Sequence, residues 1–176
     1  MAYREYAGGT SGVGWRVRYD ARMKVEGVYS FPAPADKVWD LLLDPESLRS
    51  CIPGVETLTE TSPDHWDAVM KVGVAAIRGT YKGKVGIVDK QPPQAYTLQV
   101  EGSGGPGFVK GTAKIMLQPE GEGTRVVVEG DGQVGGMLAG VGQRMLPGVA
   151  KMLMNQFFEC LIARLGVQAG SVGTPT

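Results

Sequence analysis

The sequence predicts a single α+β domain in which a strongly curved antiparallel sheet of about seven strands surrounds a long C-terminal helix. Three observations lead to this prediction. Stretches of alternating apolar and polar residues follow one another between turn residues, and such short connections favour antiparallel neighbours. A long segment with helical apolar periodicity comes last. Glycine makes up 27 of the 176 residues, and glycine within a strand permits bulges and sharp bends.

The first part of the domain is expected to hold one strand and two short helices. Alternation predicts the strand over 24–31. Pro34 suits the first turn of a helix that continues to Leu43. A second short helix is predicted over 46–51, and Pro53 ends it.

Six further strands are predicted between residues that favour turns. They cover 55–62, 65–76, 78–90, 94–102, 108–118 and 124–134. Apolar side chains alternate with charged ones, which is typical of a sheet with one face in water. Glycines interrupt these strands at Gly79, Gly83, Gly86, Gly111, Gly130 and Gly132. Glycine on a concave face removes side-chain volume, so we expect an internal hydrophobic cavity.

The last element is predicted as a helix over 137–165 with a kink at Pro147. It contains four methionines and only four charged residues. Methionine adapts to irregular apolar spaces, so these side chains are expected to line the cavity. Two alternatives stay open: an ordinary filled core, and an exposed apolar surface for a partner or a membrane.

The domain is expected over 23–166, between a loosely ordered leader at 1–22 and a flexible tail at 167–176. The leader lacks the apolar centre of a signal peptide, and nothing is long enough to span a membrane, so a cytoplasmic location is expected. Eighteen basic and eighteen acidic residues cancel, which argues against a nucleic-acid partner. Cys51 and Cys160 are interpreted as two small buried hydrophobic residues.

The sequence contains no set of residues that predicts catalysis. The single histidine, His65, is expected at a solvated strand edge. No metal-ligand, nucleophile or phosphate-binding motif is present, and the glycine-rich 102–107 is interpreted as a turn. We therefore expect no enzyme activity, no cofactor and no metal.

Three segments carry a family resemblance. They are KVEGVYSFPAPADKVWDLLLDPESLRSCIPGVE (24–56), GFVKGTAKIMLQP (107–119) and VGGMLAGVGQRMLPGVAKMLMNQFFECL (134–161). Their distinctive parts are DP at 44–45, CIPG at 51–54, GQR at 142–144 and QFF at 156–158. The chain from Met23 to Leu165 resembles the carbon monoxide dehydrogenase CoxG family of START-like (SRPBCC) helix-grip domains.

The resemblance implies a helix-grip fold, with a hydrophobic cavity between the sheet and the last helix. It also implies a non-catalytic accessory role beside a molybdenum hydroxylase of the CO dehydrogenase type, which such proteins recruit to the membrane. A quinone or another lipid is the implied cavity ligand. Family members that attach to membranes can carry a long extension, whereas about eleven residues follow Leu165 here. We therefore expect at most peripheral contact at the inner face of the cell membrane.

We expect the cavity to be lined by one set of residues drawn from the helices and the apolar strand positions. The set is Trp39, Ile52, Trp66, Met70, Tyr81, Tyr96, Phe108, Met116, Gln143, Met145, Leu153 and Phe157. Polar groups that could orient a ligand are Trp66, Tyr81, Tyr96, Thr112 and Gln143. One alternative is a small cyclase or hydrolase that uses cavity tyrosines or His65. Another is a ligand-free assembly factor that binds only protein.

Overall fold

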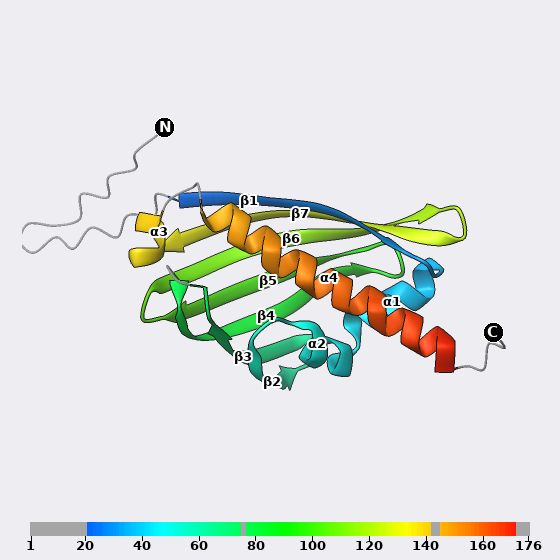
Figure 1. Ribbon diagram of the computed structural model, residues 1–176, viewed down its shortest axis with the longest axis horizontal. Helices are drawn as coiled ribbons and strands as arrows, with labels where there is room; N and C mark the ends of the chain where they lie inside the picture. Colours follow the sequence, from blue (N-terminus) through cyan, green and yellow to red (C-terminus); the bar gives the residue numbers. More distant parts are fainter. Residues whose placement is uncertain (1–20, 75–76, 142–144, 172–176) are drawn as a thin grey trace, which may run out of the picture.

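A computed structural model describes residues 21–74, 77–141 and 145–171 (Figure 1). Seven strands form one antiparallel sheet in the order β1-β7-β6-β5-β4-β3-β2. The strands are β1 (Ala21–Phe31), β2 (Val55–Ser62), β3 (His65–Val72), β4 (Gly79–Gln91), β5 (Ala95–Gly104), β6 (Gly107–Glu120) and β7 (Gly123–Gly135). The helices are α1 (Ala35–Leu43), α2 (Pro45–Cys51), α3 (Met137–Val141) and α4 (Leu146–Ser171).

The curved sheet and α4 form two layers, and α4 crosses one face of the sheet obliquely (Figure 1). The two short helices α1 and α2 lie near the second half of α4, and α3 lies at the opposite end of the sheet. The predicted α+β architecture is therefore confirmed, including the order of its strands and helices.

Local chemistry explains where α2 begins. The Oδ2 atom of Asp44 accepts hydrogen bonds from the backbone N of Ser47 at 3.1 Å and from its Oγ at 2.7 Å. Pro45 occupies the first turn, where its missing N–H costs nothing. The Asp-Pro pair thus caps one helix and separates it from α1.

The register assigns each strand residue to one of two faces. We call the face toward α4 the inner face and the opposite one the outer face. On the inner face, the Tyr29 hydroxyl of β1 donates a hydrogen bond to Asn155 Oδ1 of α4 at 2.6 Å. The Tyr29 ring also stacks on Phe158, with centroids 4.2 Å apart. Tyr29 therefore fixes α4 against β1.

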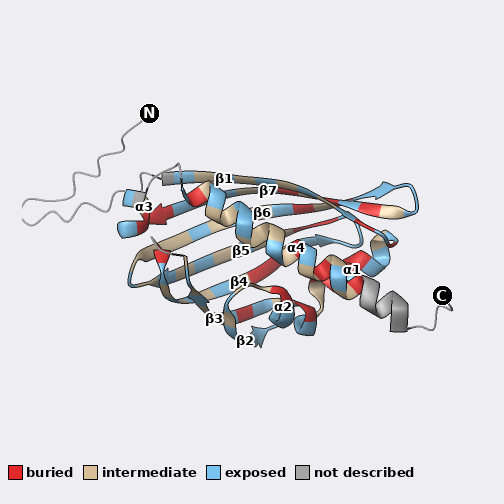
Figure 2. Ribbon diagram, viewed as in Figure 1, coloured by how far each residue is buried: buried red, intermediate tan, exposed pale blue. Residues whose placement is uncertain are grey.

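Buried apolar side chains form two clusters, one toward each end of the sheet (Figure 2). The larger cluster joins α1, α2 and the second half of α4 to the sheet and includes Phe31, Leu42, Trp66, Ile115 and Leu161. The smaller cluster consists of Ile77, Val134, Leu138 and Leu146 beneath α3 and the start of α4. The part of the sheet between them is covered less completely.

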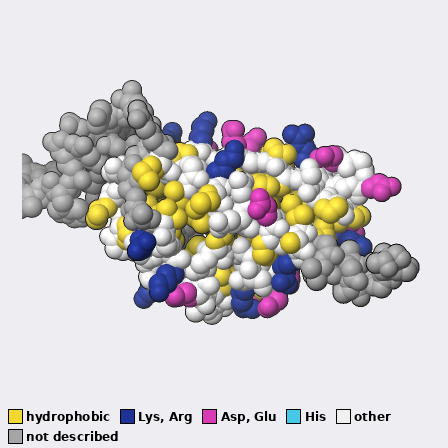
Figure 3. All heavy atoms as spheres, in the orientation of Figure 1, with side chains coloured by type: hydrophobic (Ala, Val, Ile, Leu, Met, Phe, Trp, Pro, Cys, Tyr) yellow, Lys and Arg dark blue, Asp and Glu magenta, His cyan; other side chains and the backbone are white. Residues whose placement is uncertain are grey.

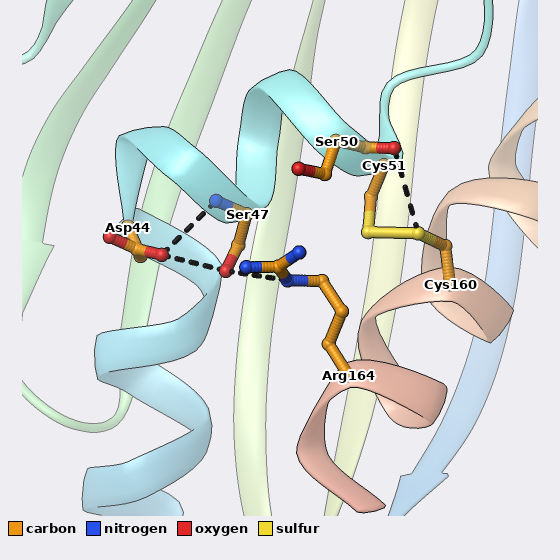
Figure 4. Close-up of a disulfide and its surroundings, with 6 residues drawn as sticks. All are labelled: Asp44, Ser47, Ser50, Cys51, Cys160 and Arg164. Carbon is orange, nitrogen blue, oxygen red and sulfur yellow. Dashed lines mark hydrogen bonds between the residues drawn. A yellow bond between two sulfur atoms is a disulfide. The ribbon is translucent and has the colours of Figure 1, made fainter. Parts of the chain in front are cut away.

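The interpretation of the two cysteines as free buried residues is wrong. Cys51 at the end of α2 and Cys160 in α4 form a disulfide, with Cα atoms 5.4 Å apart (Figure 4). They are separated by 109 positions in the chain. Only the packing of α2 against α4 brings them together, so their spacing along the chain carries no signal of the bond.

The C-terminal helix also differs from its prediction. Two helices, α3 and α4, replace one kinked helix over 137–165, and Pro147 is the second residue of α4. Proline is well tolerated in the first turn of a helix, so Pro147 starts the helix instead of kinking it. Residues 167–171, expected in a flexible tail, continue α4 to Ser171.

Two strand limits differ as well. Strand β1 begins at Ala21, inside the expected leader, because the antiparallel pairing of β1 with β7 already starts with Ala21 opposite Val134. Strand β3 ends at Val72 instead of residue 76. The rest of the expected leader, 1–20, and of the expected tail, 172–176, lies outside the described residues.

Candidate functional site: the inner face of the sheet

The middle of the inner face is formed largely by glycine. Gly83 of β4 pairs with Gly102 of β5, and Gly111 of β6 pairs with Gly132 of β7. Gly130, two residues before Gly132, lies on the same face. We call these five residues the glycine belt. It crosses four neighbouring strands obliquely and leaves this part of the sheet without side chains.

Two members of the belt have room for a Cβ atom. A Cβ atom built on Gly102 would have only backbone atoms of β4 within 4 Å, namely Lys82 O at 3.8 Å and Gly83 Cα at 4.0 Å. At Gly132 the nearest atoms, at 3.7 to 4.0 Å, belong to Lys110 and Met23. These are ordinary van der Waals distances, and the atoms come from neighbouring strands, so the described part of α4 does not pack on the belt at these positions.

The contrast with Gly27 of β1 shows where α4 does touch the sheet. A Cβ atom on Gly27 would lie 2.8 Å from Met154 Cε of α4 and 2.8 Å from Cε2 of Tyr29. Helix α4 therefore packs closely on β1 but stands away from the belt on β5 and β7.

Apolar side chains around the belt are only half-buried. They are Val25 of β1, Met70 of β3 and Val100 of β5, and Leu153 of α4 is half-buried as well. These four pack against neither of the two core clusters. The inner face thus has an apolar, half-buried middle section between two core clusters.

Eight of the predicted lining residues have an inner-face position, lie on α4 or belong to the core between the sheet and the helices. Trp66, Met70, Tyr81 and Tyr96 are on inner-face positions of β3, β4 and β5, and Leu153 is on the helical face shared with Leu146 and Val149. Trp39 is buried and meets Tyr96 edge-on, with centroids 5.5 Å apart. Ile52 and Phe157 pack against the larger cluster.

The other four predicted lining residues are not brought to this section. Phe108 pairs with Gly135 and Met116 with Val127, positions that alternate with inner-face residues, so both lie on the outer face. The prediction that these two side chains line the cavity was therefore wrong. Neighbouring residues of a strand point to opposite faces, so a residue next to an inner-face position lies on the outer face. Met145 is 49 % exposed, and Gln143 lies outside the described residues.

Two polar residues considered for ligand orientation or catalysis also face outward. Thr112 pairs with Asp131 on the exposed outer face. His65 pairs with Gly86 there, and its Nδ1 lies 2.9 Å from the carbonyl oxygen of Pro63. Neither side chain faces α4.

Three of the five polar residues predicted to orient a ligand do lie on the inner face. The Tyr81 hydroxyl donates a hydrogen bond to the carbonyl oxygen of Ile77 at 2.6 Å. Trp66 is only 4 % exposed, and its indole N–H has no partner among the described residues. Burial raises the pKa of the Tyr96 phenol well above its usual range, so it is neutral at physiological pH.

Val25, Val100 and Gly102 lie on the inner face but are not among the predicted lining residues. Val25 and Val100 occupy alternate apolar positions, so their strand patterns could have placed them. Gly102 lies at the predicted end of a strand, beside a predicted turn, and only the cross-strand pairing with Gly83 shows its position on the belt.

The outer face has a different character. A groove of about 1130 Å³ crosses it. Its charged lining residues are Arg22, Lys24, Lys84, Lys110, Asp67, Glu101 and Asp131. This face matches the predicted charged side of the sheet and is unsuited to an apolar ligand.

A third surface feature is an exposed group of methionines. Met137 of α3, Met145 just before α4 and Met152 of α4 are 74 %, 49 % and 40 % exposed. Figure 3 shows hydrophobic side chains gathered over this end of the molecule, where α4 begins. Among the described residues, no helix is both long and apolar enough to cross a membrane. The residues that the structure describes also include no group of three or more His, Cys, Asp or Glu side chains that could hold a metal ion.

The family comparison agrees with this geometry. The sequence model of the carbon monoxide dehydrogenase CoxG family matches residues 27–166, which include the whole glycine belt. The chain belongs to the CoxG family. No curated protein shows significant similarity to this CoxG-family chain.

Solved structures confirm the START-like (SRPBCC) helix-grip fold of this CoxG-family chain. A conserved protein from Geobacillus kaustophilus is 35 % identical, with a TM-score of 0.79, over 83 % of this chain and 95 % of its own. The ZhuI aromatase/cyclase from Streptomyces sp. R1128 is 16 % identical, with a TM-score of 0.66, over 88 % and 100 % of the two chains. Ara h 8.0201 is 14 % identical, with a TM-score of 0.61, over 82 % and 98 %.

Proposed function

We propose that this protein is a non-catalytic binding protein for an apolar small molecule, a quinone or another lipid. In this proposal it acts as an accessory factor for a molybdenum hydroxylase of the CO dehydrogenase type and contacts the inner membrane surface peripherally. The name of the family to which the chain belongs supports the association with carbon monoxide dehydrogenase. The support for the ligand-binding role comes from the residues on the inner face of the sheet.

The observation that carries the proposal is the room for added side-chain atoms above Gly102 and Gly132. These two inner-face positions, on β5 and β7, lack side chains, and no described atom of α4 is among the nearest neighbours of a Cβ atom built on either. The surrounding Val100, Met70 and Leu153 are apolar and half-buried. An apolar ligand placed there would remove their surface from water, which contributes about 25 cal/mol per Å².

The positions of the polar groups favour binding over catalysis. A cyclase or hydrolase needs acid and base groups that converge on one reacting atom. Tyr81 lies on the inner face of the β3–β4 pair, whereas His65 lies on its outer face. The side chains of Tyr81 and His65, which were considered for such chemistry, therefore lie on opposite sides of the sheet and cannot act on one reacting atom.

Native mass spectrometry of protein purified without detergent tests the binding role. We expect a mass adduct of several hundred daltons that organic solvent extracts, and extraction followed by mass analysis would identify it as a quinone or a different lipid. A Gly102→Leu variant should lose most of the adduct, because the added side chain extends into the proposed ligand space. Ser103→Leu adds the same side chain on the outer face and should retain it.

The partner is tested separately. Immobilised protein should retain a purified molybdenum hydroxylase of the CO dehydrogenase type, and an unrelated molybdenum enzyme should not bind. Equal retention by the wild type and the Gly102→Leu variant, with no adduct on the wild type, would instead support the ligand-free assembly factor.

A further inference from the structure

Tyr81 occupies a distinctive position next to the glycine belt. Its ring lies beside two glycines of neighbouring inner-face positions: a Cβ atom on Gly104 would be 3.1 Å from Tyr81 Cδ1, and one on Gly79 would be 3.9 Å from Tyr81 Cε2. The side chain is half-buried, packs against the smaller core cluster, and is two positions from Gly83 of the belt. Tyr81 thus stands at the end of the apolar section nearest to α3.

The hydroxyl of Tyr81 can still accept a hydrogen bond, but its proton is already in use. A phenol has one proton to donate and two lone pairs that accept. The proton is already donated to the carbonyl oxygen of Ile77 at 2.6 Å. Burial raises the pKa of the phenol above its usual value of about 10, so the proton stays in place at physiological pH. Toward a ligand, this oxygen can therefore only accept.

Ile77 holds this arrangement in place. Its side chain is buried in the smaller core cluster with Val134, Leu138 and Leu146, so its backbone carbonyl has a fixed position. Turning the Tyr81 hydroxyl to donate to a ligand would leave that carbonyl without its hydrogen bond, which is unfavourable for a partly buried acceptor.

We propose that Tyr81 selects, among apolar ligands, those that carry a hydroxyl or another hydrogen-bond donor. This inference rests on the proposed ligand-binding function and specifies the chemical class of the ligand. The donor of the ligand would lie at Tyr81, near the end of the sheet covered by α3, and its hydrocarbon part along the glycine belt. A phenol, an alcohol or the reduced, quinol form of a quinone can donate to this oxygen. The oxidised quinone cannot, so it would bind through its apolar contacts alone and without selection by Tyr81.

Three ring compounds of nearly equal shape test the inference. 2-Methylnaphthalene has no polar group, 2-methyl-1-naphthol has one hydroxyl, and 2-methyl-1,4-naphthoquinone has two carbonyls. Equilibrium dialysis at pH 7 gives the Kd of each for the wild type, for Tyr81→Phe and for Tyr29→Phe. Tyr29 is the matched control, because its hydroxyl also lies on the inner face but is bonded to Asn155 of α4.

The decisive quantity is the ratio of the Kd of the hydrocarbon to the Kd of the naphthol. We expect Tyr81→Phe to lower this ratio about fivefold, the effect of one hydrogen bond, and Tyr29→Phe to leave it unchanged. The corresponding ratio for the quinone should stay the same in all three proteins. A merely structural role of Tyr81 would weaken all three compounds equally and leave every ratio unchanged.

Two results would contradict different parts of the account. If the wild type binds the compounds but Tyr81→Phe leaves the naphthol ratio unchanged, the selection by Tyr81 is wrong while the ligand-binding function stands. If the wild type binds none of them, the proposed function itself fails for ligands of this size. A Tyr81→Leu variant repeats the measurement with a different apolar side chain, so the result does not depend on the folding of one variant.

Discussion

Cys51 of α2 and Cys160 of α4 are joined by a disulfide, and close to it Arg164 Nε of α4 donates a hydrogen bond to Ser47 Oγ of α2 at 3.2 Å (Figure 4). The second half of α4 is therefore tied covalently and by hydrogen bonding to α2. In the first half Met152 is exposed, and no described α4 atom is among the nearest neighbours of a Cβ atom built on Gly102 or Gly132. Helix α4 is thus anchored at the filled end of the domain and less constrained over the proposed ligand space.

Removing the disulfide should lower stability substantially. It closes a loop across 109 positions, and a constraint of this kind on the unfolded chain contributes about 2–4 kcal/mol. Thermal unfolding should therefore show a lower Tm in the presence of a dithiol reductant. A Cys51→Ala/Cys160→Ala double variant should have the low Tm under both conditions. An unchanged Tm of the reduced wild type, with free thiols confirmed by titration, would contradict the prediction.

Alanine at two inner-face glycines should have opposite effects on the free energy of unfolding. Gly27→Ala puts a Cβ atom 2.8 Å from both Met154 Cε and Tyr29 Cε2, so helix and ring must shift, at a cost of about 1–3 kcal/mol. Gly102→Ala meets only atoms at 3.8 Å or beyond and reduces the freedom of the unfolded chain, which stabilises by up to about 1 kcal/mol. Urea unfolding of both variants measures the difference. A clear loss of stability in Gly102→Ala would show that the space above the belt is filled.

Tyr29→Phe should destabilise the protein by about 1 kcal/mol. It removes the hydrogen bond of 2.6 Å to Asn155 but keeps the stacking on Phe158. Asn155→Ala removes the partner of the same bond, so the double variant should lose less than the sum of the two single losses. Strict additivity of the two free-energy changes would mean that the bond contributes nothing to stability.

Stability should fall at alkaline pH. Burial raises the pKa of Tyr96 and Tyr81, and burial together with the negative charge of Glu159 raises that of Tyr29. In the unfolded chain these phenols lose their protons near pH 10. Above that pH the unfolded state binds fewer protons than the folded state, so the free energy of unfolding decreases as the pH rises. Below about pH 9 these phenols stay protonated in both states, so they should not make the free energy of unfolding depend on pH.

Tyr96→Phe provides the control for the alkaline transition, because it removes the most deeply buried of these phenols. Between pH 9 and pH 11 the variant should lose less free energy of unfolding than the wild type. Equal losses would show that Tyr96 does not contribute to the pH dependence.

Much of the fold was predictable because it follows from local patterns. Alternation and turn residues located all seven strands, and Pro34 marked the start of the first short helix. Pro147 is the exception, because a proline is compatible both with a kink inside a helix and with the first turn of a new one. The sequence pattern does not distinguish these two cases.

The site was predictable only in part because it depends on pairing between distant strands. Trp66, Met70, Tyr81 and Tyr96 fell on the correct face because their strands alternate regularly. Phe108 and Met116 were included for their size and apolar character, although alternation places them on the outer face. The Cys51–Cys160 bond and the Gly83–Gly102 pair join segments far apart in the chain, and no local pattern reports such contacts.

The central claim is that the space between the glycine belt and α4 holds an apolar ligand. Titration with an environment-sensitive apolar fluorophore tests it most directly, using the wild type, Gly102→Leu and Ser103→Leu. We predict saturable binding to the wild type and to Ser103→Leu, and at least a tenfold weaker affinity for Gly102→Leu in a fully folded protein. Equal affinity of all three proteins for the fluorophore would contradict the claim.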